Sequence, residues 1–195
     1  MEYALTQPRG LASLIVANSP ASMPQWVAEA KRLRAALPAE VELKLQRHEA
    51  EGTTSDAVYQ EAVMVYYRRH LCRLEPWPEC VRRSFEKMSL NPEVYNTMNG
   101  PSEFHCIGSL KDWSIVERLG EIRGPVLLLS GRHDEATPAI VRTIHEGIPG
   151  SDWVLFEESS HMPHLEEPER FMNVLNGFLR RVEQRCPPIT PAATL

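Results

Sequence analysis

The 195-residue chain lacks several features that would assign it to a specialised class of protein. Its four cysteines form no Cys-x-x-Cys pair, which favours reduced, mostly structural thiols over a disulfide framework. No apolar run approaches the roughly 20 residues that a transmembrane helix needs. The start, Met1-Glu2-Tyr3, has neither the basic residues nor the apolar run of a signal peptide. These absences predict a soluble, cytoplasmic protein that does not associate with a membrane.

A concentrated positive charge is also absent. The formal net charge is -5, and the hydrophobic content of 43% and charged content of 24% are ordinary for a globular protein. A nucleic-acid-binding surface needs a basic footprint, so the sequence excludes this class of partner. Three arginine pairs lie among acids on predicted helices, and we interpret them as solvated helix faces. These pairs are Arg32/Arg34, Arg68/Arg69 and Arg82/Arg83.

Three short apolar runs are typical of buried parallel strands. They cover residues 11–17, 126–129 and 153–156. Residues 1–7 precede the first run and are interpreted as the end of a helix that Pro8 stops. Helices are predicted after the second and third strands, so the sequence indicates a parallel α/β sheet.

The remaining helices are predicted from the spacing of apolar residues. Between the first and second strands, residues 24–37, 55–71 and 78–90 have helical periodicity. An insertion of about a hundred residues between two strands is typical of a lid over a binding site. Thr137 is the expected N-cap of a helix that runs to about Glu146. The clearest amphipathic pattern is that of the last helix, with apolar residues spaced from Phe171 to Val182.

An acid and a histidine follow the second and third strands. Ligands of open parallel sheets bind beyond the carboxyl ends of the strands, where Asp134 and His161 are both expected. In the chain order Ser…Asp…His, they would form two thirds of a hydrolase triad, in which the acid orients the histidine ring. Asp134 would alternatively cap its own turn, and His161 would be a surface residue. A metal pair with His164 is disfavoured because Pro163 intervenes and no further ligand set is present.

The third member of such a triad has no counterpart in the sequence. No Gly-x-Ser-x-Gly elbow occurs in the 195 residues. Ser130 lies at a strand end without an elbow, and Ser102, Ser159 and Ser160 lack a strand–turn–helix context. The chain therefore carries the pattern of a chemistry whose nucleophile it does not supply.

Three segments in the right order strongly resemble the proline iminopeptidases, which are α/β-hydrolase-fold serine aminopeptidases similar to tricorn-interacting aminopeptidase. Residues 95–104, followed by Lys111-Asp112-Trp113, resemble the cap of that family. Residues 131–138 and 157–164 resemble its acid and histidine motifs. The resemblance covers residues 1–183, and it implies that Asp134 and His161 are the triad acid and base.

The resemblance also implies a site for the free amine of the substrate. Glu103 and Glu135 would bind the α-amino group, with Tyr95 near this site. Paired carboxylates recognise an ammonium through charge-assisted hydrogen bonds and reject a blocked end, which would leave buried acceptors unpaired. Without the resemblance, Glu103 would be a solvated loop acid and Glu135 an acid favoured at a helix start.

The fold expected is a partial α/β-hydrolase with an inserted helical cap. Residues 1–20 would form the end of the nucleophile helix and one core strand. Residues 21–120 would form the cap, and residues 121–185 the core with the acid and histidine loops. Residues 186–195 would form a disordered tail. No cofactor or metal is implied.

The expected function is a serine aminopeptidase that releases N-terminal proline or another small apolar residue from peptides with a free N-terminus. In the family, the oxyanion loop and the nucleophile precede the region that matches Met1. We therefore expect a truncated and inactive chain. The alternatives are a non-catalytic module that binds or completes a partner, and an amidase or esterase of the same fold. An in-frame serine elbow just upstream of Met1 in the DNA would favour truncation.

Overall fold

A computed structural model of the protein describes residues 1–185. The predicted tail at 186–195, which includes Cys186, lies outside the described residues. No helix in residues 1–185 is long and apolar enough to cross a membrane.

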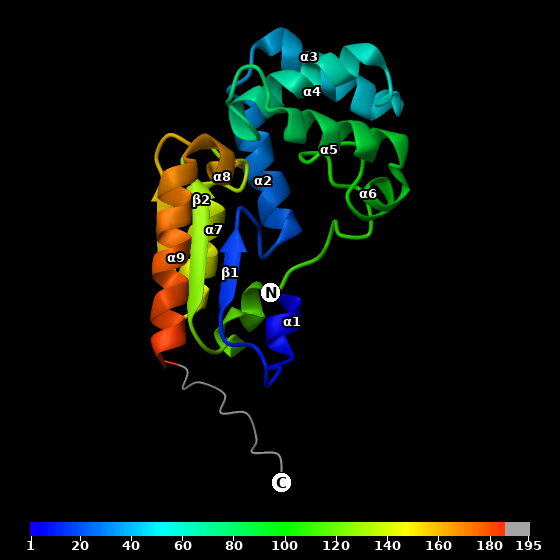
Figure 1. Ribbon diagram of the computed structural model, residues 1–195. Coiled ribbons are helices and arrows are strands. Elements are labelled where there is room, and N and C mark those ends of the chain that lie inside the picture. The colour runs from blue at the N-terminus through cyan, green and yellow to red at the C-terminus, as the bar shows by residue number, and fades with distance from the viewer. Residues whose placement is uncertain (186–195) are drawn as a thin grey trace.

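A three-stranded parallel sheet is the centre of the fold (Figure 1). The strand order is β1 (Leu14–Ala17), β2 (Val126–Gly131) and β3 (Asp152–Phe156). Leu14 pairs with Val126, although about 110 residues of chain separate them. The first strand is shorter than predicted, because residues 11–13 are not paired into the ladder. The predicted parallel α/β sheet is confirmed.

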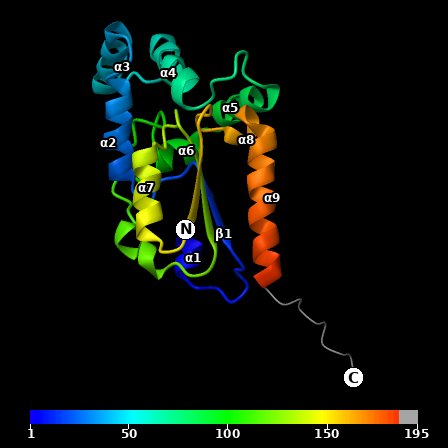
Figure 2. The same ribbon diagram turned by 90° about the vertical axis from the view of Figure 1, so that its left-hand side faces the viewer.

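Helices cover both faces of this sheet, as a parallel sheet requires. Figure 2 shows α7 (Pro138–Gly147) and α9 (Pro168–Arg185) on opposite sides of the strands. The side chains of alternate residues in β2 point to opposite faces of the sheet. Leu127 and Leu129 pack with Phe156 and residues of α9, whereas Leu128 packs with residues of α7 and of α1 (Glu2–Leu5).

The segment between β1 and β2 is helical, and its helices α3 to α5 lie beyond the carboxyl ends of the strands (Figure 1). This segment, called the cap below, has its own core, centred on the buried Tyr59, Tyr66 and Leu45. Its elements are α2 (Met23–Arg34), α3 (Ala39–Glu51), α4 (Ala57–His70), α5 (Glu79–Leu90), α6 (Glu93–Met98) and the 3-10 helix η1 (Val116–Glu121).

Two helix starts differ in detail from the sequence-based expectations. Helix α4 begins at Ala57, two residues after the predicted start at 55, and its N-cap is Asp56, which accepts a hydrogen bond from the main-chain N–H of Val58 at 2.8 Å. Thr137 precedes α7 as predicted, but its side chain does not cap that helix. Its hydroxyl instead donates to the Glu29 carboxylate of α2 at 2.7 Å, so it ties the cap to the core.

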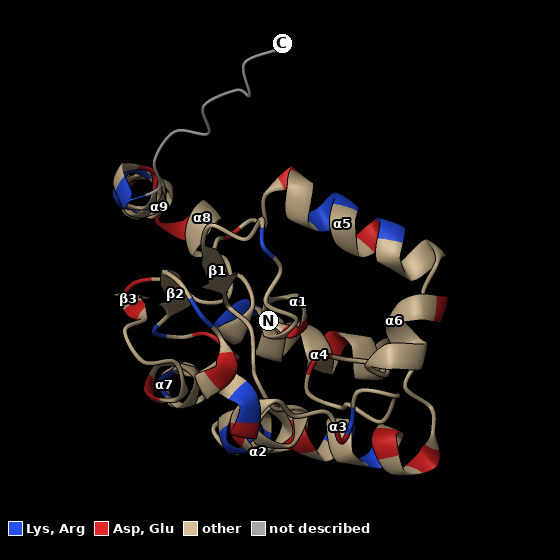
Figure 3. Ribbon diagram, turned by 90° about the horizontal axis from the view of Figure 1, so that it is seen from below, with Lys and Arg blue, Asp and Glu red and all other residues tan. Residues whose placement is uncertain are grey.

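The expectation that every arginine pair is solvated is wrong for Arg34. Its side chain is 6% exposed and forms ion pairs with Glu42 and Glu49 of α3 at 2.8 and 2.9 Å. The guanidinium also lies over the ring of Phe104, 4.9 Å from its centroid. Elsewhere in the cap, charges of both signs alternate along α3 and α5, as Figure 3 shows.

The described cysteines are all free thiols, with Cys72 and Cys106 buried and Cys80 exposed. This agrees with the prediction of reduced, mostly structural thiols. The proposed domain boundaries remain a prediction, since the cap and the sheet share contacts through α2 and α7.

Candidate functional site

Asp134 lies in the turn that follows β2, at the carboxyl end of the sheet. Its side chain is fully buried, and three groups donate to it. Oδ1 accepts from the main-chain N–H of Ala136 and from Nδ1 of His161, both at 2.8 Å. Oδ2 accepts from the side-chain amide of Asn18 at 2.5 Å. The two interpretations of Asp134 are therefore compatible, since one carboxylate both closes its turn and holds the histidine.

His161 lies in the loop between β3 and the short helix α8 (Pro163–Glu166). Nδ1 donates to Asp134, so Nε2 is the ring nitrogen that stays available to another group. No hydrogen-bond partner of Nε2 is found within residues 1–185. Burial opposes the charged form of the ring, but the negative charges of Asp134, Glu135 and Glu103 outweigh it. Together they raise the pKa of His161 to about 9. The side chain is 26% exposed, so it is accessible from the pocket described below.

The histidine loop is packed directly against the acid turn. A Cβ atom added to Gly131 would lie 2.1 Å from the Ser160 carbonyl oxygen and 2.4 Å from that of Ser159. Only glycine allows this approach of two backbones, which fixes the separation of the two loops. The main-chain N–H of His133 also donates to the Ser159 carbonyl at 3.0 Å.

Glu135 is 1% exposed, and neither of its carboxylate oxygens has a hydrogen-bond partner in the described part of the chain. Burial, reinforced by the negative charge of Glu103, raises its pKa well above the ordinary value. A buried carboxylate without a donor is costly, so this group is poised for a cationic or hydrogen-bonding ligand.

Glu103 follows α6 and lines the pocket together with His161. Burial also raises its pKa, whereas His161 and the hydroxyl of Tyr95 favour its charged form. Tyr95 lines the same pocket and accepts a hydrogen bond from the Asn99 amide at 3.1 Å. The hydroxyl of Tyr66 is buried without a partner in residues 1–185, and Glu135 is the charge that acts on it most strongly. Two carboxylates and two phenols therefore surround one region beside His161.

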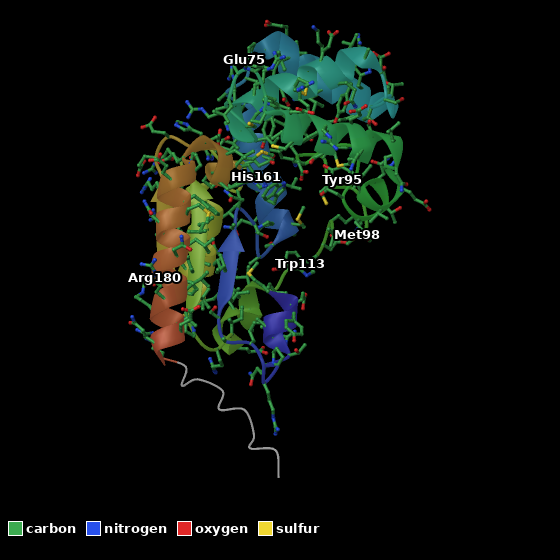
Figure 4. The ribbon with its side chains drawn as sticks, in the orientation of Figure 1. Glu75, Tyr95, Met98, Trp113, His161 and Arg180 are labelled. Atoms are coloured by element: carbon green, nitrogen blue, oxygen red, sulfur yellow. The ribbon has the colours of Figure 1, made fainter. Side chains whose placement is uncertain are left out.

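A pocket of about 570 Å³ opens between the sheet and the cap. Figure 4 shows His161 at the sheet end of this region, with Tyr95 and Met98 on the cap side. Apart from Glu103, His161 and three asparagines, one of which is Asn18, the walls are mostly apolar. The apolar and aromatic lining residues are Pro20, Met23, Trp26, Met88, Val94, Tyr95, Met98 and Leu110.

Trp26 connects the two ends of the candidate site. Its indole N–H donates to the Glu103 carbonyl at 2.6 Å, and its ring meets that of His161 edge-on at 6.2 Å between centroids. Four other aromatics of the segment between β1 and β2 have contacts within the fold. Tyr66 and Phe104 belong to the cap core, Trp77 packs on Phe85, and Trp113 donates to Glu2.

The serines near the sheet edge are bonded to groups other than His161. Ser130 accepts from the Trp153 indole, and Ser102 shares a hydrogen bond with Tyr59. Ser159 and Ser160 donate to Glu167 and Glu166. Within residues 1–185, none of them therefore takes the position of a nucleophile.

No group of three or more His, Cys, Asp or Glu residues in the described range could hold a metal ion. His164, the alternative partner of His161 in the sequence, instead packs against Phe171 with ring centroids 5.9 Å apart.

Two residues of the candidate site were not singled out from the sequence. Asn18, the residue that follows β1, donates to the second oxygen of Asp134. A left-handed φ of 52° at a strand end is a conformation that asparagine adopts readily. Glu166, the last residue of α8, accepts two hydrogen bonds from Ser160 in the histidine loop.

Known proteins resemble this chain in sequence and in structure. No protein-family model matches the chain. The proline iminopeptidase of Saccharolobus solfataricus is 39% identical over 180 residues, which are 92% of this chain and 58% of that protein. The proline iminopeptidase of Heyndrickxia coagulans is 37% identical over 92% of this chain and 62% of that protein. This chain thus spans about three fifths of the length of these relatives.

Solved structures also match nearly all of this chain and about three fifths of their own length. VinJ has a TM-score of 0.91 and 47% identity, with 93% of this chain and 61% of that chain covered. The proline iminopeptidase of Mycobacterium smegmatis has a TM-score of 0.85 and 46% identity, with 94% and 62% covered. A thermophilic esterase, at 18% identity and a TM-score of 0.61, shares the fold alone. The predicted resemblance is confirmed: this chain is homologous to the C-terminal three fifths of the proline iminopeptidases and has the corresponding part of their α/β-hydrolase fold.

Proposed function

We propose that this chain carries the acid, the base and the amine-binding groups of a serine aminopeptidase of the proline iminopeptidase type. The observation that carries the proposal is the 2.8 Å hydrogen bond between Asp134 and His161, at the edge of a pocket that also contains Glu103. The substrate would be a peptide or amino-acid amide with a free N-terminal proline or another small apolar residue.

In the proposed reaction, His161 in its neutral form acts as general base for a serine that lies outside these 195 residues; a substrate ammonium that neutralises Glu103 and Glu135 favours this neutral form. The serine oxygen attacks the carbonyl carbon of the N-terminal residue while Nε2 takes its proton. His161 then gives this proton to the departing amine, and the peptide bond breaks to leave an acyl-enzyme. A water molecule, deprotonated by His161, hydrolyses the ester and restores the serine. Asp134 orients the ring through Nδ1 and stabilises the imidazolium.

The Glu103–Glu135 pair supplies the proposed selectivity for a free N-terminus. A substrate ammonium would give the oxygens of Glu135 the donors that they lack. A blocked amine would bring no charge to this buried site, so the pair would reject internal peptide bonds. We also retain the cytoplasm as the proposed location.

Binding to the chain itself tests the amine site. We expect L-prolinamide to bind, and N-acetyl-L-prolinamide to bind at least about 10-fold more weakly, as measured by isothermal titration calorimetry at pH 8. Glu135→Gln and Glu103→Gln each remove one charge-assisted hydrogen bond. Each substitution should therefore lower the affinity for L-prolinamide by about 10- to 100-fold. Glu93→Gln, an exposed acid on α6, is the matched control and should change nothing. Equal affinity for both amides would remove the pair from this role.

Catalysis is tested on two proteins. The 195-residue chain should not hydrolyse L-proline 4-nitroanilide above the buffer rate. A protein expressed from an upstream-extended reading frame with a Gly-x-Ser-x-Gly elbow should hydrolyse it, and His161→Ala should abolish that activity. Turnover by the 195-residue chain that depends on His161 would contradict the proposed external nucleophile. An upstream frame without an elbow would favour a non-catalytic binding module.

A further inference from the structure

We propose that Glu166 is a positioning residue, which clamps the loop of His161 to the end of cap helix α4. The inference rests on the proposed function, because it assigns Glu166 to the support of the proposed catalytic base. Glu166 does not touch the reacting atoms, and it acts through the residue that precedes His161.

The carboxylate of Glu166 binds the histidine loop with both of its oxygens. Oε2 accepts from the main-chain N–H of Ser160 at 2.7 Å, and Oε1 accepts from the Ser160 hydroxyl at 2.7 Å. Ser160 is completely buried and is the immediate neighbour of His161. Two short bonds to one residue therefore set both the position and the rotation of the peptide unit that leads into the histidine.

The same carboxylate also reaches the cap. Oε1 accepts a third bond, from the main-chain N–H of Arg73, at 2.7 Å. The Arg73 guanidinium donates to the carbonyl of Glu158, in the histidine loop, at 2.8 Å. One cap residue thus binds the loop twice, once through Glu166 and once directly.

The segment that ends α4 is bonded to the acid turn as well. A ring nitrogen of His70 lies 2.9 Å from the His133 carbonyl oxygen, and the His70 carbonyl accepts from the main-chain N–H of Glu135 at 3.2 Å. Residues 70–73 therefore join the Asp134 turn and the His161 loop from the cap side. Loss of the Glu166 carboxylate would leave the Arg73–Glu158 bond as the remaining link between residues 70–73 and the His161 loop.

The charges that raise the pKa of His161 most are those of Asp134, Glu135 and Glu103, and Glu166→Asp changes none of them. A change in position can therefore be separated from a change in charge. Glu166→Asp keeps the charge but withdraws the carboxylate by one methylene, so it cannot bridge Ser160 and Arg73. Glu158→Gln removes a charge from the histidine loop but keeps the main-chain groups that the clamp uses.

The experiment is an NMR titration of the His161 imidazole in the 195-residue chain with labelled histidine, in which His161→Gln assigns the signal. We expect wild type and Glu158→Gln to titrate near 9. Glu166→Asp should titrate about one pH unit or more lower, towards 6.5, because the ring leaves its alignment with Asp134. Arg73→Ala, an exposed change that spares the Glu166 bonds, should give a smaller shift in the same direction.

The outcomes separate this inference from the proposed function. A wild-type His161 that titrates at its ordinary pKa would contradict the Asp134–His161 pair and the function with it. A raised wild-type value that Glu166→Asp leaves unchanged would overturn the positioning role alone. If Glu166→Asp fails to fold, as judged by its near-ultraviolet circular dichroism, Ser160→Ala is titrated in its place, because it removes the hydroxyl bond to Oε1 and keeps the charge of Glu166. An unchanged value in that variant would likewise overturn the role.

Discussion

Asn18 donates its side-chain amide to Oδ2 of Asp134 at 2.5 Å, while His161 binds the other carboxylate oxygen. The amide comes from the residue after β1 and the carboxylate from the turn after β2. The pairing of these two strands therefore brings a donor to the proposed triad acid from a neighbouring strand end. Asp134 is held from both sides, which restricts the rotation of its side chain.

Replacement of Asn18 should destabilise the chain to a degree that depends on the backbone. Asn18→Gly loses a hydrogen bond to a charged group, which should lower the free energy of unfolding by about 1.5–3 kcal/mol. Asn18→Ala should cost roughly 1 kcal/mol more, because alanine is strained at the φ of 52°. Urea unfolding at pH 7 measures both values. Equal stability of the alanine and glycine variants would contradict the left-handed conformation.

The stability of the chain should fall as the pH rises through the titration of His161. Its pKa is about 9 in the folded chain against an ordinary 6.5, so the ion pair with Asp134 contributes fully below about pH 6.5. That contribution is lost as the pH rises through 9, and it amounts to about 3 kcal/mol.

The measurement is the free energy of unfolding of wild type and His161→Gln between pH 6 and 10. The difference between the two proteins should shrink with rising pH. A constant difference would show that His161 does not titrate in this window.

Glu135→Gln should stabilise the chain while it weakens the binding of an amine. The pKa of Glu135 is raised in the folded chain, so its ionisation does not lower the free energy of unfolding below about pH 4.5. Above that pH, the free energy of unfolding that this group takes away grows as the pH rises. At pH 8 the variant should be more stable than wild type by roughly 2 kcal/mol, with the gain absent near pH 4. Glu93→Gln is the control and should change stability by less than about 0.5 kcal/mol. A destabilised Glu135→Gln chain at pH 8 would show that the carboxylate has a partner.

Arg34 should be far more important for stability than its neighbour Arg32. Arg34→Ala leaves Glu42 and Glu49 without their buried cation, which should cost about 3–5 kcal/mol. Arg32 is 61% exposed and pairs with Glu29, so Arg32→Ala should cost less than about 1 kcal/mol. Urea unfolding of both variants tests this contrast. Similar losses would mean that the Arg34 pairs are as solvated as that of Arg32.

Much of the fold could be predicted because its signals are local. The apolar runs at β2 and β3 and the periodicity of α9 indicate buried strands and an amphipathic helix directly. Helix α3 was not predicted individually, because charged and polar residues surround its few inward-facing positions. The burial of Arg34 depends on glutamates 8 and 15 residues further along, which only the packing of α2 on α3 brings together.

The candidate site also has a part that could be predicted from the sequence and a part that could not. Asp134 and His161 could be expected to meet, because one helix and one strand separate them and return the chain to the same sheet edge. The partners of Asp134 and His161 from other segments could not be foreseen. Asn18 reaches Asp134 through the β1–β2 register, and Arg73 reaches the histidine loop through the placement of the cap. Such contacts depend on tertiary structure and leave no pattern in the sequence.

The insertion of the cap between β1 and β2 has a consequence for the folding pathway. Leu14 can pair with Val126 only after the whole intervening segment has been drawn into a closed loop, at an entropic cost. The cap has a core of its own, within that loop, and its early collapse would bring the two strand ends together. The sheet should therefore form late, so a weakened cap such as that of Arg34→Ala would slow folding more than it speeds unfolding.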